Sequence, residues 1–411
     1  MKTLDEKVLC GIKELYGDKQ YKLQVARYTD ILEKFNSKYT GEPIFISSPG
    51  RIEICGNHTD HQHGRVLGSA IDLDTAGAVV ENPDGTIIVD SVGYAPVVFN
   101  VNDLKLKEEE KGTSIALTKG VLKYLSDKGY RIGGFTVLAT SRVFKGAGVS
   151  SSASFEVFIG KIVSVLFNDD LITPLELVYA SHFAENVYFG KPCGLLDQSM
   201  IAIGGVNYID FIDSTTPKIE TIEIDLSDYG IVLVNTGGDH SDLTQCYADV
   251  KNEMKEVAEF FGREVLRDVE YEAFLDKLPQ LSNVVSGRAI LRAGHFFAEN
   301  DRVKRASEAL KENDTETFFD MLNQSGESSY KLLQNCYAPM DTAQRIPLAL
   351  FVADNLDGVV AKRVHGGGFA GTILIIVSKD KLDLLHRKME DTFGEENVYC
   401  LSIRNKGAVK F

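Results

Sequence analysis

Residues 50–64 contain the side chains of this sequence that are best suited to binding a polar ligand. Their sequence is GRIEICGNHTDHQHG, which brings an arginine, three histidines and an aspartate into one short stretch. The stretch lies between two apolar runs, residues 43–46 and residues 66–71, so we expect a loop where the chain turns. The packing of a hydrophobic core does not need this composition. It is typical of a pocket for a ligand with several hydroxyl groups.

Residues 146–154, GAGVSSSAS, have the composition of a loop that binds phosphate. Gly146 and Gly148 permit unusual backbone angles and the close approach of a ligand. The serines that follow supply hydroxyl and N–H groups just before an apolar helix expected at residues 155–165, and the N-terminus of a helix binds anions readily. From the residues alone, a serine-capped helix with a flexible lead-in is an equally good interpretation. The GxxxxGK[ST] pattern of the common nucleotide-binding loop is absent from the sequence.

Two acidic residues that suit phosphoryl transfer follow this loop. A helix is expected from Thr173, because the sequence TPLE combines an N-cap, a proline at the first position and a capping-box glutamate. This helix carries Glu185 and ends near Gly190, and Asp197 follows in the sequence PCGLLDQ. Phosphoryl transfer needs a metal ion to neutralise developing charge and a group that orients or deprotonates the attacking hydroxyl. By composition alone, Glu185 is a solvated carboxylate on a helix.

Three stretches, in one order, resemble the motifs of a known family. Residues 50–64, residues 146–154 and GGGFAG at residues 366–371 resemble the sugar-site, phosphate-binding and C-terminal motifs of galactokinases, which belong to the GHMP kinases together with homoserine, mevalonate and phosphomevalonate kinases. The resemblance runs from about residue 40 to the end of the chain. It implies an α+β fold of two domains with the active site in the cleft between them. It also implies ATP- and Mg²⁺-dependent phosphorylation of the C1 hydroxyl of galactose, which gives galactose 1-phosphate and ADP.

The resemblance implies roles for individual residues, position by position. Asp197 matches the catalytic base that acts on the anomeric hydroxyl, and Arg51 matches an arginine that lowers the pKa of this aspartate and stabilises the transferred charge. Ser152 and Glu185 match the pair that holds Mg²⁺. The residues implied for the sugar are Asn57, His58, Asp60, Gly194 and Tyr247, and those implied for the nucleotide are Gly146, Gly148, Ser150, Ser151, Ser152, Ala153 and Ser154.

Three positions of the sugar motif depart from the family pattern. Where galactokinases have Asn, Glu and Tyr, this chain has Glu53, Asn57 and His61. In one interpretation Glu53 and Asn57 have exchanged roles, and the pocket binds galactose. In the other, loss of a carboxylate at position 57 admits a sugar that carries its own carboxylate at C6, and residues 60–62 also resemble those of galacturonokinases. We favour galactose, because most of the remaining motif resembles that of galactokinases.

The nucleotide side departs from the family as well. By position, Ser114 and Leu117 replace a tryptophan and a tyrosine that galactokinases place before the phosphate loop, and the chain has no tryptophan. Two further hypotheses lie outside the sugar-1-kinases. One is a non-catalytic sugar sensor, because some relatives of galactokinases have that role; the serine run, Glu185 and Asp197 argue against it. The other is a kinase of a non-sugar alcohol such as mevalonate, which conflicts with the His-Thr-Asp and Asp-Gln motifs.

The composition of the whole chain is that of a globular protein. Its 411 residues are enough for two domains, and 44% of them are hydrophobic. The 44 basic and 59 acidic residues give a net charge of −15, which argues against nucleic-acid binding. The start of the chain lacks the apolar core of a signal peptide, and no apolar run approaches membrane-spanning length. The six cysteines show no CxxC spacing, which favours a reduced, cytoplasmic protein whose partners are a small sugar and ATP.

Strands and helices of mixed order must position these motifs. Strands are expected at residues 44–47, 76–80, 86–92, 134–139 and 231–234, and on both sides of the Gly-rich turn within residues 356–376. Helices are expected at residues 5–38, 114–124, 155–165 and 173–188, and throughout most of residues 249–354 with breaks near Gly262 and Asn313. We place a domain boundary in the acidic residues 219–228. This predicts an N-terminal kinase domain at residues 1–222, with residues 1–40 as a helical prelude, and a C-terminal domain at residues 223–411.

Overall fold

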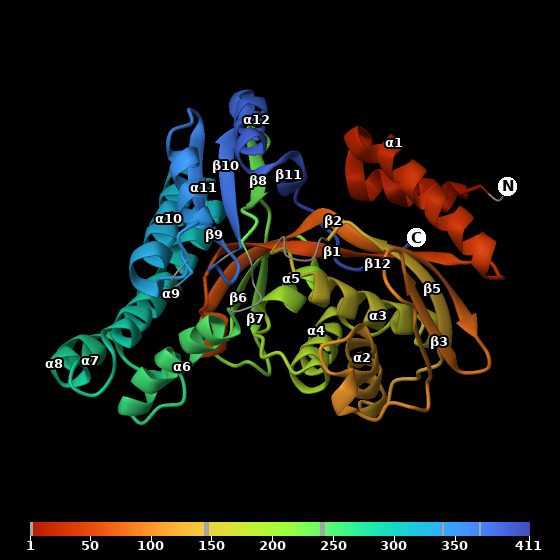
Figure 1. Ribbon diagram of the computed structural model, residues 1–411, viewed down its shortest axis with the longest axis horizontal. Helices are drawn as coiled ribbons and strands as arrows, with labels where there is room; N and C mark the ends of the chain where they lie inside the picture. Colours follow the sequence, from red (N-terminus) through yellow and green to blue (C-terminus); the bar gives the residue numbers. More distant parts are fainter. Residues whose placement is uncertain (1–2, 144–147, 239–242, 339–340, 370) are drawn as a thin grey trace.

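Two β-sheets flanked by helices make up the described part of the chain (Figure 1). The computed structural model describes residues 3–143, 148–238, 243–338, 341–369 and 371–411. Within these ranges the first sheet has eight strands, in the order β12-β1-β2-β5-β3-β4, with β6 paired to β2 and β7 paired to β6. These strands are β1 (Ile44–Cys55), β2 (Arg65–Asn82), β3 (Thr86–Ser91), β4 (Val97–Asn100), β5 (Gly134–Ser141), β6 (Val206–Asp210), β7 (Lys218–Ile222) and β12 (Val409–Lys410).

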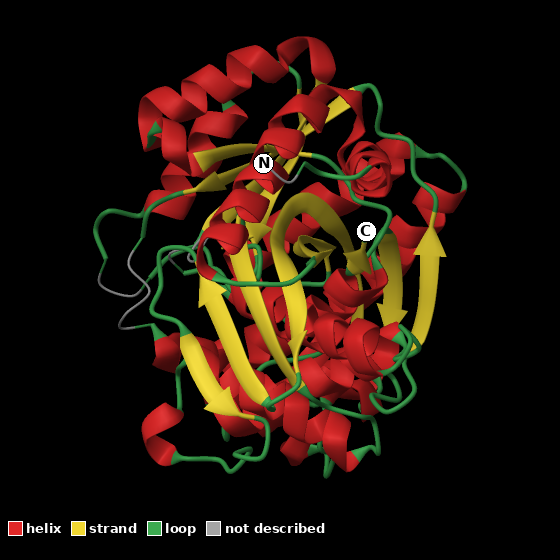
Figure 2. Cartoon of the chain, turned by 90° about the vertical axis from the view of Figure 1, so that its right-hand side faces the viewer, coloured by secondary structure: helices red, strands yellow, loops and turns green. Residues whose placement is uncertain are grey.

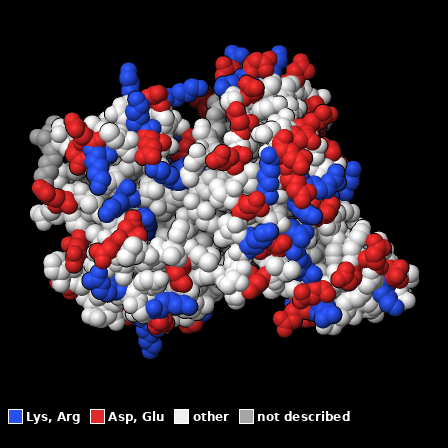
Figure 3. Space-filling model, turned by 180° about the vertical axis from the view of Figure 1, so that it is seen from behind, with Lys and Arg blue, Asp and Glu red and all other residues white. Residues whose placement is uncertain are grey.

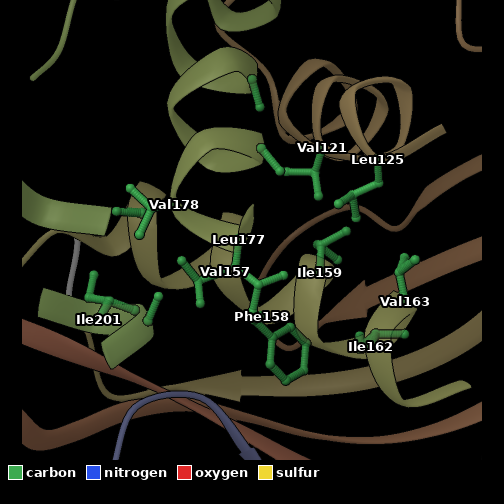
Figure 4. Packing of buried hydrophobic residues seen from close by; sticks show 14 of the residues in the cluster. Val121, Leu125, Val157, Phe158, Ile159, Ile162, Val163, Leu177, Val178 and Ile201 are labelled. Carbon is green, nitrogen blue, oxygen red and sulfur yellow. The ribbon is translucent and has the colours of Figure 1, made fainter. Parts of the chain in front are cut away.

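Helices cover both faces of the first sheet (Figure 1 and Figure 2). The helices on one face are α2 (Ser114–Asp127), α3 (Ser151–Phe167), α4 (Pro174–Phe183) and α5 (Leu196–Ile203), and α1 (Glu6–Lys38) lies on the other face. The sequence of α3 is apolar on most of its surface, which is typical of a buried helix. Its side chains Phe158 and Ile162 are fully buried among residues of α2, α4 and α5 (Figure 4). The N-terminus of α3, which follows the phosphate loop, is therefore held by a packed core.

Among the described residues, the second sheet has four antiparallel strands in the order β11-β8-β10-β9, and helices pack against it. A shared core with residues of β1, β2, α9, α10, β8 and β10 joins the two sheets. None of the helices in the described part of the chain is long and apolar enough to cross a membrane. The elements of this half are α6 (Thr244–Phe260), α7 (Tyr271–Asp276), α8 (Leu278–Leu281), α9 (Gly287–Lys311), α10 (Thr315–Ser328), α11 (Arg345–Asp354), α12 (Leu382–Phe393), β8 (Tyr229–Asn235), β9 (Val359–His365), β10 (Thr372–Ser378) and β11 (Val398–Leu401).

The sequence predicted the type of most elements correctly, and its main error concerns the motif with the histidines. Arg51 lies within β1 and not in a loop. β1 continues to Cys55 because it pairs with β2 along its whole length, across irregularities at Pro49/Gly50 and Glu53/Cys55. Nearly every residue of β1 is buried, so the strand shows no alternation of apolar and polar residues that would reveal it. The loop itself is shorter and contains a single 3₁₀ turn, Asp60–Gln62.

The predicted helix start at Thr173 is confirmed. The Oγ1 atom of Thr173 accepts a hydrogen bond of 3.2 Å from the N–H of Glu176, and Pro174 is the first residue of α4. After α4 the chain continues as a π-helical turn, Ala184–Phe189, which ends at Gly190 in a left-handed conformation. The domain boundary that we place between residues 222 and 223 lies between β7 and β8, and the last strand, β12, returns to pair with β1. The division into domains stays a prediction.

Asp74 of β2 ties three separate parts of the chain to the outer face of the first sheet. It is fully buried, and it accepts hydrogen bonds from Tyr16 and Arg27 of α1 and from Ser47 of β1. Arg404 near the C-terminus lies 3.6 Å away. Burial by itself disfavours the charged form, but the two arginines lower the pKa of Asp74 below its usual value. The carboxylate is therefore charged and paired at neutral pH.

We expect the variant Asp74→Asn to be destabilised by about 3–5 kcal/mol at pH 7, because it leaves the fully buried Arg404 and the largely buried Arg27 without their counter-charge. Since the pKa of Asp74 is lowered on folding, its contribution is present above the unfolded pKa of about 4 and is lost as the pH falls through the folded value. The difference between the two proteins should therefore shrink in acid. Urea unfolding at neutral and acidic pH measures this.

The matched control is Asp30→Asn, which removes an exposed ion pair between Asp30 and Lys34 of α1. This variant should change the free energy of unfolding by less than about 1 kcal/mol. Equal stability of the Asp74 and Asp30 variants at pH 7 would contradict the role of this network.

Candidate functional site

Asp197 lies where β1, the phosphate loop and α5 meet. The Nε atom of Arg51 donates to Oδ1 of Asp197 at 2.8 Å, and NH1 of the same guanidinium donates to the carbonyl of Gly148. The hydroxyl of Ser150 donates to the second oxygen, Oδ2. Strand β1 supplies Arg51, the first turn of α5 supplies Asp197, and Ser150 immediately precedes α3. The structure therefore brings together three residues that the sequence motifs singled out.

The electrostatics of Asp197 suit a base that is ionised before substrate arrives. Burial favours the neutral acid, but the charge and hydrogen bond of Arg51 and the hydroxyl of Ser150 lower its pKa below the usual value. Each carboxylate oxygen accepts one hydrogen bond in this state. An ionised carboxylate has further lone pairs, so it can still accept a bond from a substrate hydroxyl.

The phosphate loop has the backbone of an anion site. Ser150 has a left-handed conformation with φ 62°, and α3 begins at the next residue, so the first N–H groups of the helix have no partner within it. Gly148 also has a positive φ, and a Cβ atom there would lie 2.4 Å from Oγ1 of Thr372, so a side chain does not fit. Gly146 lies outside the described residues.

The first turn of α3 consists of Ser151, Ser152, Ala153 and Ser154. These residues differ in the hydrogen-bond donors that they can present to a ligand. Ser154 uses its N–H for a helical bond to Ser150 and its hydroxyl for a bond of 3.0 Å to the carbonyl of Ser48. Both of its donors therefore face the protein. Ala153 is buried, and it has only its N–H to offer. Ser151 and Ser152 are partly exposed at the start of α3.

Ser152 and Glu185 are adjacent, as the metal prediction requires. The hydroxyl of Ser152 donates to Oε1 of Glu185 at 2.9 Å, and Nε2 of Gln198 donates to Oε2 at 2.9 Å. Magnesium is usually bound by one or two carboxylates together with substrate phosphates and water, and a hydroxyl with a carboxylate fits that chemistry. The described residues include no group of three or more His, Cys, Asp or Glu that would hold an ion by themselves. One hydroxyl and one carboxylate suit a metal ion whose remaining ligands are phosphate oxygens and water.

Lys191 is a charged residue of the site that the sequence motifs did not identify. Its Nζ atom lies 3.1 Å from Oε1 of Glu185. The signal was a basic residue between the helix-ending Gly190 and Pro192, directly beside the recognised PCGLLDQ segment. A lysine in such a turn is usually solvated, so position in the sequence alone gave no reason to select it.

On the sugar side, Asp60 and Gly194 are in contact. A Cβ atom at Gly194 would lie 1.8 Å from Oδ2 of Asp60, so a side chain at this position would displace the Asp60 carboxylate. Oδ1 of Asp60 accepts a hydrogen bond of 2.9 Å from the N–H of His61. Burial and the nearby charge of Asp197 raise the pKa of Asp60 to about 6. Two neighbouring carboxylates are thus shifted in opposite directions.

His58 and Tyr247 both contact the C-terminal glycine-rich motif. Burial lowers the pKa of His58 to about 4, so its imidazole is neutral at pH 7 and Nε2–H donates to the carbonyl of Gly367 at 3.1 Å. The hydroxyl of Tyr247, on α6, donates to the carbonyl of Gly368 at 3.1 Å, and its ring packs edge-on against Phe369. A Cβ atom at Gly367 would lie 2.5 Å from this ring. His240 and Ser241, which precede Tyr247 in the sequence, lie outside the described residues.

Asn57 is held in a fully buried network and not in an open pocket. Its amide donates to Oε1 of Glu53 at 2.9 Å and to the carbonyl of Gly366 at 2.7 Å, and its Oδ1 accepts from Asn335 at 2.8 Å. The NH2 group of Arg363 donates to the same oxygen of Glu53 at 2.8 Å. The sequence did not single out Asn335, which lies far along the chain and in no recognisable motif.

The two positions at which the nucleotide side departs from the family pattern lie on α2. Ser114 is the first residue of this helix and is exposed, and Leu117 is buried. Neither position offers an exposed aromatic ring for stacking on a base.

Comparisons with known proteins show which family the chain belongs to. The galactokinase galactose-binding signature matches residues 33–80, and the GHMP kinases N terminal domain matches residues 116–205. The galactokinase of Clostridium tetani is 30% identical over 85% of this chain and 87% of its own length. The galactokinase of Limosilactobacillus reuteri strain DSM 20016 is 30% identical over 94% and 96%.

Solved structures give the same result for the fold. The crystal structure of Lactococcus lactis galactokinase complexed with galactose superposes with a TM-score of 0.82 at 25% identity, over 93% of this chain and all of that one. The mevalonate kinase of Methanococcus jannaschii, at 18% identity, shares the fold with a TM-score of 0.64 over 89% of this chain and 99% of its own. The predicted α+β GHMP kinase fold is confirmed. The chain belongs to the galactokinase family of the GHMP kinases.

Proposed function

We propose that this protein transfers the γ-phosphoryl group of ATP to the C1 hydroxyl of galactose, giving galactose 1-phosphate and ADP. The observation that carries the proposal is the position of Asp197, which is ionised, paired with Arg51 and hydrogen bonded to Ser150 at the start of α3. A base, a cation and a helix N-terminus thus converge at one point, as phosphoryl transfer to a hydroxyl requires. Family membership supports the same reaction.

In this reaction Asp197 accepts the proton of the C1 hydroxyl as the sugar oxygen forms its bond to the γ-phosphorus. The bond from phosphorus to the β–γ bridging oxygen breaks, and its electron pair leaves with ADP. Arg51 and the N–H groups at the start of α3 stabilise the charge on the transferred group. A magnesium ion held by Ser152 and Glu185 would supply neutralisation of the phosphate charge. The six free cysteines accord with our proposal that the enzyme acts in the reducing cytoplasm.

The hydrogen bond between Glu53 and Asn57 supports galactose over galacturonate. The two side chains are in direct contact, so an exchange of carboxylate and amide keeps both groups in one place. Both N–H groups and the carbonyl oxygen of Asn57 have protein partners, whereas Oε2 of Glu53 has no hydrogen-bond partner among the described residues. A carboxylate at C6 of the sugar would then approach the negative charge of Glu53. A neutral C6 hydroxyl can donate to that oxygen.

The function is tested by measuring ADP release from Mg·ATP with one acceptor at a time. The acceptors are galactose, galacturonate, N-acetylgalactosamine, arabinose and mevalonate. We expect turnover with galactose. The variant Glu53→Gln should lower kcat/KM for galactose by about 10- to 100-fold and raise the ratio of galacturonate to galactose turnover, because one like charge is removed. Thermal stability is measured alongside, since Glu53 also pairs with Arg363. Turnover with galacturonate alone would favour a galacturonokinase. Binding of ATP without ADP release on any sugar would favour a sensor.

We expect Asp197→Asn to lose about 10²- to 10⁴-fold in kcat while it still binds ATP, because the amide cannot accept the proton. Single-turnover kinetics at saturating substrate measure the chemical step, and calorimetry measures ATP binding. Asp213→Asn, an exposed carboxylate in the loop between β6 and β7, serves as the control and should leave kcat unchanged. Near-normal turnover of the Asp197 variant would show that another group is the base.

The raised pKa of Asp60 predicts a pH dependence of sugar capture. Because the ionised carboxylate accepts hydrogen bonds from hydroxyl groups and the protonated acid does so less well, kcat/KM for galactose should fall as the pH drops below about 6. The pH profile of Asp60→Asn should lack this acidic limb and lie lower throughout. A limb near pH 6 that persists in the variant would assign the titration to a different group.

A further inference from the structure

A lysine ammonium occupies the side of Glu185 on which the nucleotide is proposed to bind. Nζ of Lys191 contacts Oε1 of Glu185, the same oxygen that accepts the hydroxyl of Ser152. The Lys191 side chain is 61% exposed, whereas that of Glu185 is 3% exposed. The ammonium therefore reaches a buried carboxylate from the solvent side.

The backbone fixes the base of this side chain and leaves only its tip free to move. The N–H groups of Gly190 and Lys191 both donate to the carbonyl of Glu185, the second at 3.0 Å. Gly190 has a φ of 84°, which ends the π-helical turn, and Pro192 keeps the preceding residue out of the helical conformation. The Lys191 backbone is thus held against the residue that its side chain contacts. Its flexible four-carbon stem can still redirect the charge.

The charge of Lys191 acts on residues from two separate parts of the chain. It interacts electrostatically with Asp197, the proposed base, and with Tyr247 of α6, which contacts the C-terminal motif. Arg51, the other cation beside Asp197, is held by two hydrogen bonds to Asp197 and Gly148. Among the described residues of the site, Lys191 is therefore a cation that can move without breaking a bond to the base.

We propose that Lys191 is a catalytic residue that exchanges Glu185 for the transferred phosphoryl group when the nucleotide binds. The inference rests on the proposed kinase function. Ser152 and Glu185 would hold a divalent ion through the oxygen that Lys191 contacts, and its charge would disfavour the ammonium there while the phosphate oxygens would attract the ammonium. The ammonium then donates hydrogen bonds to an oxygen of the γ-phosphoryl group and stabilises its charge during transfer. In the free enzyme the same ammonium neutralises Glu185, so the buried carboxylate is never left unpaired.

The test compares Lys191→Met, which keeps the length of the side chain but removes its charge, with Lys191→Arg, which keeps a cation. The control is Lys34→Met, which removes a lysine paired to an aspartate on α1, on the far face of the first sheet. Three quantities are measured: kcat, the magnesium concentration for half-maximal activity, and the Kd of a non-hydrolysable ATP analogue by calorimetry. Melting temperatures confirm that each variant is folded.

For Lys191→Met we expect kcat to fall about 100-fold and the Kd of the analogue to rise about 10-fold, because a phosphate contact is lost. Half-maximal activity should need less magnesium than in the parent protein, since no ammonium competes for Glu185. Lys191→Arg should recover most of kcat, and Lys34→Met should match the parent in all three quantities. A purely structural role of Lys191 would not lower the magnesium requirement and the turnover together.

The proposal is overturned if Lys191→Met keeps the parental kcat and analogue affinity, or if its magnesium requirement rises. Should Lys191→Met unfold, Lys191→Arg and Lys191→Gln give the same comparison, with only the arginine variant expected to retain turnover. If the parent protein phosphorylates none of the sugars, the proposed function fails on that result alone. The affinity of the analogue for the parent and the variants still decides whether Lys191 contacts phosphate.

Discussion

The contact between Arg51 and Asp197 is the interaction on which the rest of the site depends. Its two partners come from β1 and α5, and the same guanidinium also holds the carbonyl of Gly148 in the phosphate loop. Three elements that are far apart in the sequence are thus fixed around one ion pair. Because Arg51 is almost completely buried, desolvation makes an unpaired charge at either end costly, which holds the loop in place before substrate arrives. Such preorganisation is the main contribution that a protein makes to phosphoryl transfer.

A second set of polar contacts connects the sugar motif to the C-terminal motif. The N–H of Glu53 donates to Nε2 of His365, so the neutral imidazole carries its proton on Nδ1 and donates it to Thr372 at 3.1 Å. Arg363 pairs with the carboxylate of Glu53. Strands β1, β9 and β10 are therefore joined by buried hydrogen bonds and not by apolar packing alone. Substitutions at the unusual positions of the sugar motif act on this junction as well as on the ligand.

Burial alone does not decide what each carboxylate of the site does. Asp60 and Asp197 are both desolvated, but only Asp197 has an arginine against it, so its pKa falls while that of Asp60 rises. Glu185 is neutralised by Lys191 and keeps hydrogen bonds to Ser152 and Gln198. One carboxylate is thus suited to accept a proton, one to respond to pH near neutrality, and one to hold a cation. Different neighbours give three similar groups distinct chemistry, as is common in enzyme active sites.

The sequence by itself determined the family and the fold, and it proposed most of the residues of the candidate site, because motifs such as PCGLLDQ depend on local backbone geometry that a short string of residues specifies. It also predicted the types of most elements, although it placed Arg51 in a loop, since a strand buried on both faces shows no alternating pattern. Only the tertiary structure showed that Asn57 is enclosed by Glu53 and Asn335, and that Lys191 contacts Glu185. These contacts join residues through the packing of separate elements, and side-chain direction and desolvation there depend on the whole fold.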